Sequence, residues 1–318
     1  MKRISLLSAF LCAAAVLGFA SAKQEPSRLT IYSLKGPSGV GMIKLFETPP
    51  NISNTQVNME ALASSDLMAA RFIAGEAKVG ILPPNVAAKI AASGKPVQVA
   101  AVTGLGMLSL LSGDPAVKTI DDLKGKTITV AGQGAAPDYV FRKILVAHNL
   151  NPDLDVKLDY SLAYPEIAQS LIAGRINLAL IPEPFATMAR QGNENLAQVS
   201  DIQAEWEKAG GQENYPITTL VIDARFGKEN PAAVETIMTA VKNSIDWVTA
   251  NPAEAGDLVE KYGLGIKASV AAASIPRSNY TFIDANTARP ALTSLYKTLL
   301  EFAPDSIGGH LPADDFYY

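Results

Sequence analysis

Two glycine-rich loops are the segments of this sequence best suited to hold a small molecule. One runs from Lys35 to Gly39 and the other from Gly132 to Ala135, and each follows a short apolar run that predicts a strand. Glycine lets the backbone come close to a ligand, and the amides at a helix start carry the positive end of its dipole. Lys35 suits an anion, whereas Gln133 both donates and accepts hydrogen bonds. No G-x-x-x-x-G-K-[S/T] motif occurs, so the phosphate loop of nucleotide-binding proteins is excluded.

Further polar and aromatic side chains follow predicted strands or open predicted helices. Ser64 and Ser65 have the chemistry of a helix N-cap, and Asn85 comes shortly after the predicted strand 78–82. Because ligands of parallel sheets bind beyond the carboxyl ends of the strands, we expect these residues to lie together at the entrance of one binding site. The predicted ligand-binding set is Lys35, Ser38, Gly39, Ser64, Ser65, Asn85, Thr103, Gly132, Gln133, Gly134, Ala135, Tyr164, Glu183 and Tyr215.

Most members of this set also have a purely structural interpretation. A carboxylate between prolines at a helix start stabilises the helix dipole, and we favour that role for Glu183 over contact with a ligand amine or amide. Asn85 either touches the ligand or caps its helix. Tyr164 and Tyr215 either stack on a flat ligand or pack in the core. Lys35 is either an anion contact or a solvated surface charge.

One strand, loop and helix plan occurs twice at a constant offset. The segment 172–184 repeats the segment 73–85 after a shift of 99 residues without a gap, with Ile, Ala, Gly and the first Pro in identical places. At the same shift, residues 29–31 fall on residues 128–130. An offset that holds from residue 29 to residue 85 indicates an internal duplication. We therefore expect two similar lobes.

The order of predicted elements indicates how these lobes are connected. Strands alternate with helices of about ten residues, which predicts parallel βαβ units. The predicted fold class is α/β, with two Rossmann-like lobes, a ligand cleft between them and a helical C-terminal tail packed on lobe one. Lobe one comprises residues 27–103 and 218–318, lobe two comprises residues 107–215, and the hinge crossings lie near residues 103–106 and 214–219.

The C-terminal tail has clear helix signals. Asn230 and Asn251 each precede a proline, a pattern typical of an N-cap followed by the first helical residue. A last helix is expected from about residue 286 to residue 302, because its apolar residues recur on one face.

Residues 1–22 have the layout of a secretory signal peptide. Two basic residues, an apolar stretch and the A-x-A cleavage site Ala20-Ser-Ala22 follow one another. We expect an exported protein, and the resemblance given below implies the periplasm. Lipoprotein attachment through Cys12 is disfavoured, because the preceding residue is Leu11 rather than a small residue.

Charge and cysteine content narrow the class of partner. Removing residues 1–22, with Lys2 and Arg3, takes the formal net charge from −4 to −6, so a basic footprint for nucleic acid is absent. Cys12 is the only cysteine, so the mature chain has no thiolate to hold a metal. We predict a small-molecule ligand, no cofactor and no nucleic acid partner.

With these features, the chain resembles the periplasmic solute-binding proteins of ABC importers, in the NMT1/THI5-like and SsuA/TauA branch of the type II fold. The stretches that carry the resemblance are residues 34–39, 74–81, 123–126 before 132–134, and Glu183-Pro-Phe185. The resemblance implies a monomer whose lobes close over a small ligand and whose closed form docks on a membrane permease with its cytoplasmic ATPase.

Three alternatives remain open for the ligand and the activity of this protein. Tyr164, Tyr215, Gln133 and Glu183 favour a heteroaromatic vitamin or vitamin precursor of pyrimidine or flavin type, which is our working hypothesis. Lys35 favours an aliphatic sulfonate, taurine or nitrate. The third alternative is an enzyme of cofactor biosynthesis with the same fold.

The residue types argue against the third alternative. The resemblance implies that the related fungal pyrimidine synthases need histidine and a cysteine-rich motif. The mature chain has only His148 and His310, and it lacks HExxH and CxxC motifs and any Ser-His-Asp arrangement. We expect no enzymatic activity.

Overall fold

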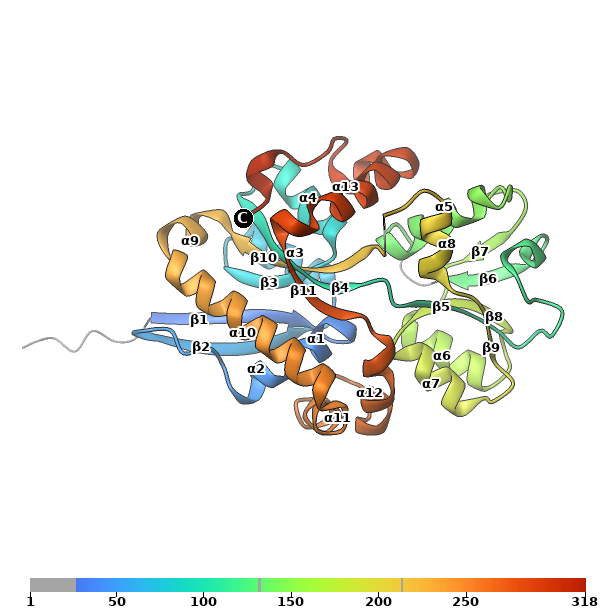
Figure 1. Cartoon of the computed structure of the whole chain (residues 1–318), viewed down its shortest axis with the longest axis horizontal. Coiled ribbons are helices and arrows are strands. Elements are labelled where there is room, and N and C mark those ends of the chain that lie inside the picture. The colour runs from blue at the N-terminus through green and yellow to red at the C-terminus, as the bar shows by residue number, and fades with distance from the viewer. Residues whose placement is uncertain (1–26, 131–132, 213) are drawn as a thin grey trace, which may run out of the picture.

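The computed structural model describes residues 27–130, 133–212 and 214–318 as a mixed α/β protein with two sheets (Figure 1). The predicted signal peptide and Gly132 lie outside the described residues. The strands are β1 (Ser27–Leu34), β2 (Thr55–Leu62), β3 (Val79–Leu82), β4 (Val97–Leu105), β5 (Leu108–Ser112), β6 (Thr127–Val130), β7 (Lys157–Asp159), β8 (Leu178–Pro182), β9 (Ala197–Ser200), β10 (Pro216–Asp223) and β11 (Tyr280–Asp284). The helices are α1 (Pro37–Gly41), α2 (Ile43–Glu47), α3 (Ser65–Ile73), α4 (Pro84–Ala92), α5 (Ala136–Ala147), α6 (Tyr164–Ile172), α7 (Phe185–Gly192), α8 (Ile202–Lys208), α9 (Ala224–Glu229), α10 (Pro231–Ala250), α11 (Pro252–Lys261), α12 (Ala268–Ser274) and α13 (Ala285–Phe302), with 3-10 turns η1 (Ile120–Leu123), η2 (Ile275–Arg277), η3 (Pro304–Ile307) and η4 (Asp314–Phe316).

The six-stranded sheet has the order β11-β4-β10-β3-β1-β2. The strand β1 pairs in parallel with β2 and with β3, as expected for βαβ units. The strand β10 lies between β3 and β4 and is antiparallel to both. The four residues of β3 are all buried, which fits a central strand rich in branched side chains. We call this sheet, with α1 to α4 and α9 to α13, lobe one.

The five-stranded sheet repeats the plan of the first. Its order is β7-β6-β8-β5-β9, where β6 is parallel to β7 and β8, and β5 is antiparallel to β8 and β9. The helices α3 and α6 begin at Ser65 and Tyr164 and end at Ile73 and Ile172, both 99 residues apart. The two similar lobes predicted from the duplication are therefore confirmed. We call this sheet, with α5 to α8, lobe two.

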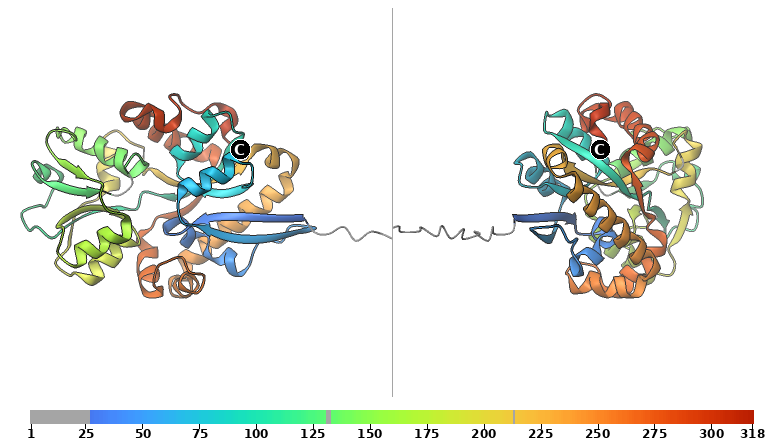
Figure 2. Two further views of the ribbon diagram at one scale, coloured as in Figure 1. Left: turned by 180° about the vertical axis from the view of Figure 1, so that it is seen from behind. Right: turned by 60° about the vertical axis from the view of Figure 1, so that its left-hand side comes forward.

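The expectation of parallel units was incomplete, because each lobe also holds an antiparallel strand beside its third strand. The strands β10 and β5 enter the lobes directly from the chain crossings, so they run opposite to the βαβ strands. Figure 1 and the view from behind in Figure 2 show the two lobes at opposite ends, joined by extended segments. The residue boundaries predicted for lobes and hinges stay a prediction.

The crossings meet at Gly106, between β4 and β5. The Gly106 amide donates to Oδ1 of Asn214 at 2.9 Å, which ties the first crossing to the second. The Gly106 carbonyl accepts from Nε2 of Gln203 on α8 at 2.9 Å and from Nδ2 of Asn279 before β11. Three segments far apart in sequence are thereby held at one backbone position.

The C-terminal helices cover lobe one as predicted, and α13 also contacts α5 of lobe two. Asn230 and Asn251 stand at the N-cap positions of α10 and α11, but neither side chain makes a capping bond. Each Nδ2 instead donates backward, to the carbonyl of Phe226 and of Trp247 respectively. The preceding helices end there, and each of these carbonyls also accepts the backbone amide of the same asparagine, so the side chain adds a second bond to the last turn.

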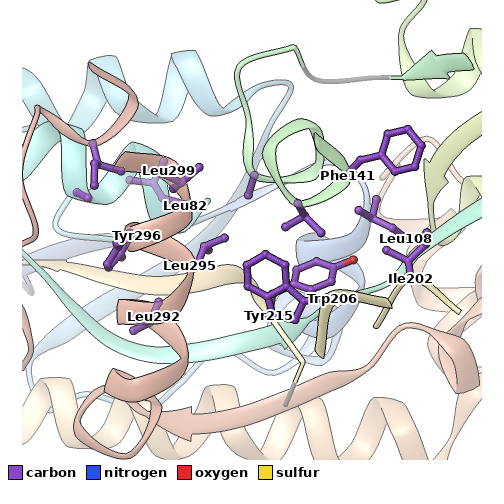
Figure 3. Close-up of a cluster of buried hydrophobic side chains, with 14 of the residues drawn as sticks. Leu82, Leu108, Phe141, Ile202, Trp206, Tyr215, Leu292, Leu295, Tyr296 and Leu299 are labelled. Atoms are coloured by element: carbon purple, nitrogen blue, oxygen red, sulfur yellow. The ribbon is translucent and has the colours of Figure 1, made fainter. Parts of the chain in front are cut away.

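A hydrophobic core continues from one lobe into the other. Leu292, Leu295 and Tyr296 of α13 share one buried cluster with Trp206 of α8 and Tyr215 of the second crossing. Figure 3 shows the Trp206 and Tyr215 rings between the α13 side chains and the lobe-two residues. Within the described ranges, no helix is both long enough and apolar enough to span a membrane.

Candidate ligand-binding site

A cavity of about 570 Å³ lies between the two lobes. Lobe one contributes residues 34–38, 63–65, Pro83, Leu264 and Gly265; lobe two contributes residues 135–137, 163–165, Pro182 and Phe185; and the crossings contribute Met107, Ile217 and Thr218. Most of these segments directly follow strands of the two sheets, so the cavity lies beyond the carboxyl ends of the strands, where ligands of such sheets bind.

Several helices begin at the wall of this cavity. The starts of α1, α3, α5 and α6 are marked by the lining residues Pro37, Ser65, Ala136 and Tyr164. Helix starts present N–H groups and a positive dipole end, which favours an anion or a hydrogen-bond acceptor. Proline in the first turn of α1, α5 and α6 removes one of these N–H groups in each helix. Of these four helices, α3 has no proline in its first turn, but its Leu67 amide is already bonded to the Ser64 side chain.

The polar groups of the wall gather on the lobe-one side. Lys35 is exposed, whereas Ser38 is buried. Ser64 caps α3, because its Oγ accepts from the Leu67 amide at 3.4 Å, which confirms the predicted N-cap. No Asp or Glu side chain is among the described residues that line the cavity. The wall thus offers one positive charge and no side-chain negative charge.

An aromatic pair forms part of the lobe-two wall. The rings of Tyr164 and Phe185 stack with centroids 5.8 Å apart and an angle of 16° between their planes. Burial raises the pKa of Tyr164 to about 12, so its hydroxyl stays protonated near neutral pH. With Leu34, Met107 and Leu264, the pair makes the cavity predominantly apolar.

Of the predicted set, Lys35, Ser38, Ser64, Ser65, Ala135 and Tyr164 line the cavity. Sequence reasoning missed the lining residues Met107, Phe185, Thr218 and Leu264. Phe185 had a signal, since it follows the Glu183-Pro pair at a predicted helix start. Leu264 had none, because it reaches the cavity from the turn between α11 and α12, far along the chain.

Several predicted residues lie beside the cavity rather than on it. Gly39 packs behind the wall, where an added Cβ would lie 2.6 Å from a Leu264 methyl carbon. Thr103 hydrogen-bonds Oγ1 of the lining residue Thr218 at 3.0 Å. Asn85 is buried on α4 without a capping bond. The lining residues listed above do not include Gln133 and Gly134, which are exposed, and Gly132 is not described.

Glu183 has the structural role that its sequence setting favoured. Its carboxylate is 1% exposed, accepts from the Thr187 amide at 2.9 Å and pairs with Nη2 of Arg190 at 3.0 Å. The first bond lies in the first turn of α7 and the second reaches Arg190 in its last turn, so the carboxylate stabilises that helix. It is not among the lining residues.

Tyr215 packs in the core. Its ring is fully buried and meets the Trp206 ring edge-on, with centroids 5.6 Å apart. The side chain therefore points into the interlobe core rather than into the cavity. The strand pattern around residue 215 did not reveal this direction, because a shift of one position moves a strand side chain to the opposite face.

A family model and a curated protein resemble this chain in sequence. Residues 56–255 match the model of the family described as NMT1/THI5 like. The putative binding protein YtlA of Bacillus subtilis is 24% identical over 134 residues, which are 42% of this chain and 38% of that protein. The match thus spans well under half of the relative's length.

Solved structures resemble this chain along most of its length. An ABC transporter protein from Parabacteroides distasonis is 24% identical with a TM-score of 0.79, over 92% of this chain and 99% of that chain. The periplasmic aliphatic sulphonate binding protein SsuA of Escherichia coli is 16% identical with a TM-score of 0.73, over 92% of both chains. The fold is therefore that of the type II periplasmic binding proteins.

Proposed function

Since the chain belongs to the NMT1/THI5-like family, we propose that it is the substrate-binding component of an ABC importer. The observation that supports this proposal most directly is the cavity of about 570 Å³, whose wall is formed by both lobes. A ligand there touches both lobes at once, so its binding energy favours the closed arrangement. The proposal includes export to the periplasm through residues 1–22, a monomeric state, and delivery to a permease driven by a cytoplasmic ATPase.

We propose binding without catalysis. Proton transfer needs a titratable side chain close to the reacting atom. Lys35 and Tyr164 are the titratable side chains among the lining residues, and Tyr164 stays protonated near neutral pH. His148 is held between Asp121 and Glu205, outside this wall. His310 is exposed and is not among the lining residues.

The ligand that the wall supports best is an organic anion with an apolar body. Lys35 and the helix starts at the wall favour negative charge, and the apolar lining favours a hydrocarbon part. Of the four residues that favoured a heteroaromatic vitamin, only Tyr164 lines the cavity. We therefore place a sulfonate of alkyl or aryl type ahead of the vitamin hypothesis.

The second candidate ligand is a flat heterocycle, such as a pyrimidine vitamin precursor or a flavin. The stacked pair of Tyr164 and Phe185 favours it, because an aromatic face supports an offset stack with a planar ring.

A thermal-shift screen of the purified protein tests the function. The compounds are hexanesulfonate, naphthalene-2-sulfonate, taurine, nitrate, thiamine, its pyrimidine precursor and riboflavin. A ligand at 100 times its dissociation constant stabilises the fold by about 2.7 kcal/mol. We expect the two apolar sulfonates to raise the melting temperature. The shift should fall in Lys35→Ala and with rising salt, and it should persist in Lys95→Ala, which removes an exposed lysine outside this wall.

Other results would redirect the proposal. A shift with heterocycles alone that is lost in Tyr164→Leu would support the second candidate. No shift with any compound would contradict both ligand classes. Conversion of a bound compound, detected by mass spectrometry, would contradict a binding role without catalysis.

A further inference from the structure

Asp138 is a buried carboxylate directly behind the lobe-two wall of the cavity. It lies in the first turn of α5, is 3% exposed, and follows the lining residues Ala135 to Pro137 without being one of them. We infer that Asp138 is the positioning residue that fixes two separate lining segments, residues 135–137 and 163–165, relative to each other. This inference rests on the proposed function of the cavity.

The first bond of Asp138 fixes the turn before α5. Its Oδ2 accepts from the Gly134 amide at 3.0 Å. Gly134 has a φ of +75°, a conformation that side chains disfavour, and Ala135 follows it at the cavity wall. A hydrogen bond from a backbone amide to a charged acceptor is stronger than a neutral one. The carboxylate thus sets the direction in which the chain enters the wall.

The second bond reaches the other lining segment. The hydroxyl of Tyr160, just after β7, donates to Oδ1 of Asp138 at 2.7 Å. Ala163 and Tyr164 follow a few residues later and line the cavity. Burial and the bond to Asp138 raise the pKa of Tyr160, so its hydroxyl remains a donor at neutral pH. One carboxylate therefore holds both loops.

The charge of Asp138 is balanced locally. Nε of Arg142, one turn along α5, donates to Oδ1 of Asp138 at 3.0 Å. On its outer side, Nη1 of Arg142 binds the exposed Asp153 at 2.9 Å. Asp153 shares the arginine but is not among the lining residues. It is therefore a matched control for Asp138.

The experiment compares Tyr160→Phe, Asp138→Asn and Asp153→Asn with the wild-type protein. Tyr160→Phe keeps the ring and removes only the hydroxyl, so it disturbs folding less than Asp138→Asn does. The first readout is the dissociation constant of naphthalene-2-sulfonate, measured by calorimetry at 15 °C, far below unfolding. The second is hydrogen exchange of the Gly134 amide, measured by NMR without ligand.

We expect weaker probe binding in both variants of the network. Tyr160→Phe and Asp138→Asn should each raise the dissociation constant about 10-fold. A factor of this size corresponds to the free energy of the one hydrogen bond that fixes the lining segments. Asp138→Asn should also speed Gly134 exchange about 10-fold or more. Asp153→Asn should change both readouts less than about 3-fold, because exposed ion pairs contribute little.

Two outcomes would overturn the inference. The first is a lowered melting temperature in both variants with an unchanged dissociation constant, which would make Asp138 merely a stabiliser of the fold. The second is unchanged Gly134 exchange in Asp138→Asn. If wild-type protein does not bind naphthalene-2-sulfonate, the proposed anion class fails, and the exchange measurement alone then decides the role of Asp138.

Discussion

Replacing Gly106 by alanine tests how the two chain crossings are packed. An added Cβ would lie 2.5 Å from Cζ of Tyr215 and 2.6 Å from Oδ1 of Asn214. The Tyr215 ring has no room to retreat, because it is fully buried against Trp206. Asn214 accepts the Gly106 amide, so moving its side chain breaks that bond.

The expected loss of stability follows from these two contacts. Overpacking a core by one methyl group costs about 1–3 kcal/mol, and losing the bond to Asn214 adds about 1 kcal/mol. A total of about 3 kcal/mol corresponds to a fall of roughly 5 °C in the melting temperature, because the unfolding entropy is about 2.1 cal/mol/K per residue. Urea unfolding followed by tryptophan fluorescence measures the free energy, and Trp206 reports from beside the substitution.

The matched control is Gly113→Ala, at the other end of β5. An added Cβ there would meet its nearest atoms at 3.6 Å, an ordinary contact, so the change should stay within about 0.5 kcal/mol. The loss from Gly106→Ala should also shrink in a Tyr215→Ala background, which removes the ring that the methyl group meets. Equal stabilities of Gly106→Ala and Gly113→Ala would refute the packing argument. So would a loss from Gly106→Ala that stays the same in the Tyr215→Ala background.

Three further substitutions test charges and caps. Burial opposes the charge on His148, but hydrogen bonds to Glu205 and a second carboxylate outweigh it and raise the pKa of His148. That stabilisation is complete below pH about 6.5 and is lost as the pH rises through the raised pKa. His148→Gln should therefore lower the free energy of unfolding in urea more at pH 6 than at pH 9. Equal losses at the two pH values would contradict this role of the charged His148. Glu183→Gln should cost about 2 kcal/mol in the same assay, because Arg190 loses its charged partner, while ligand affinity stays within about 3-fold; a larger affinity loss would place Glu183 at the ligand. Ser64→Ala should cost about 1 kcal/mol through loss of the α3 cap, and an unchanged melting temperature would refute that role.

The duplicated part of the fold could be predicted because its signals are local. Each strand, glycine and helix start in one repeat has a counterpart 99 residues away, and α3 and α6 confirm that offset at both ends. The antiparallel strands β5 and β10 could not be assigned in this way, because their partners are set by the tertiary arrangement of the crossings.

The residues of the candidate site also differ in whether local sequence signals could predict them. Lys35, Ser65 and Tyr164 line the cavity because they begin loops or helices at strand ends, a position that sequence order reveals. Leu264 lines the cavity from a turn that is distant in sequence, and the Tyr215 side chain points into the core because its ring packs against Trp206. Both outcomes depend on contacts between segments that no local pattern connects.

The position of β10 constrains the order in which the chain can fold. This strand fills the space between β3 and β4, yet it begins at Pro216, after every strand of lobe two. Until it is in place, β3 and β4 each keep one edge without the partner they have in the finished sheet. Lobe two is formed by one continuous stretch of chain, whereas the larger sheet needs a segment that is synthesised later. Completing lobe one therefore requires pairings between residues far apart in sequence, which slow folding in general, and we expect β3 and β4 to be exposed to pairing with other chains until β10 joins them.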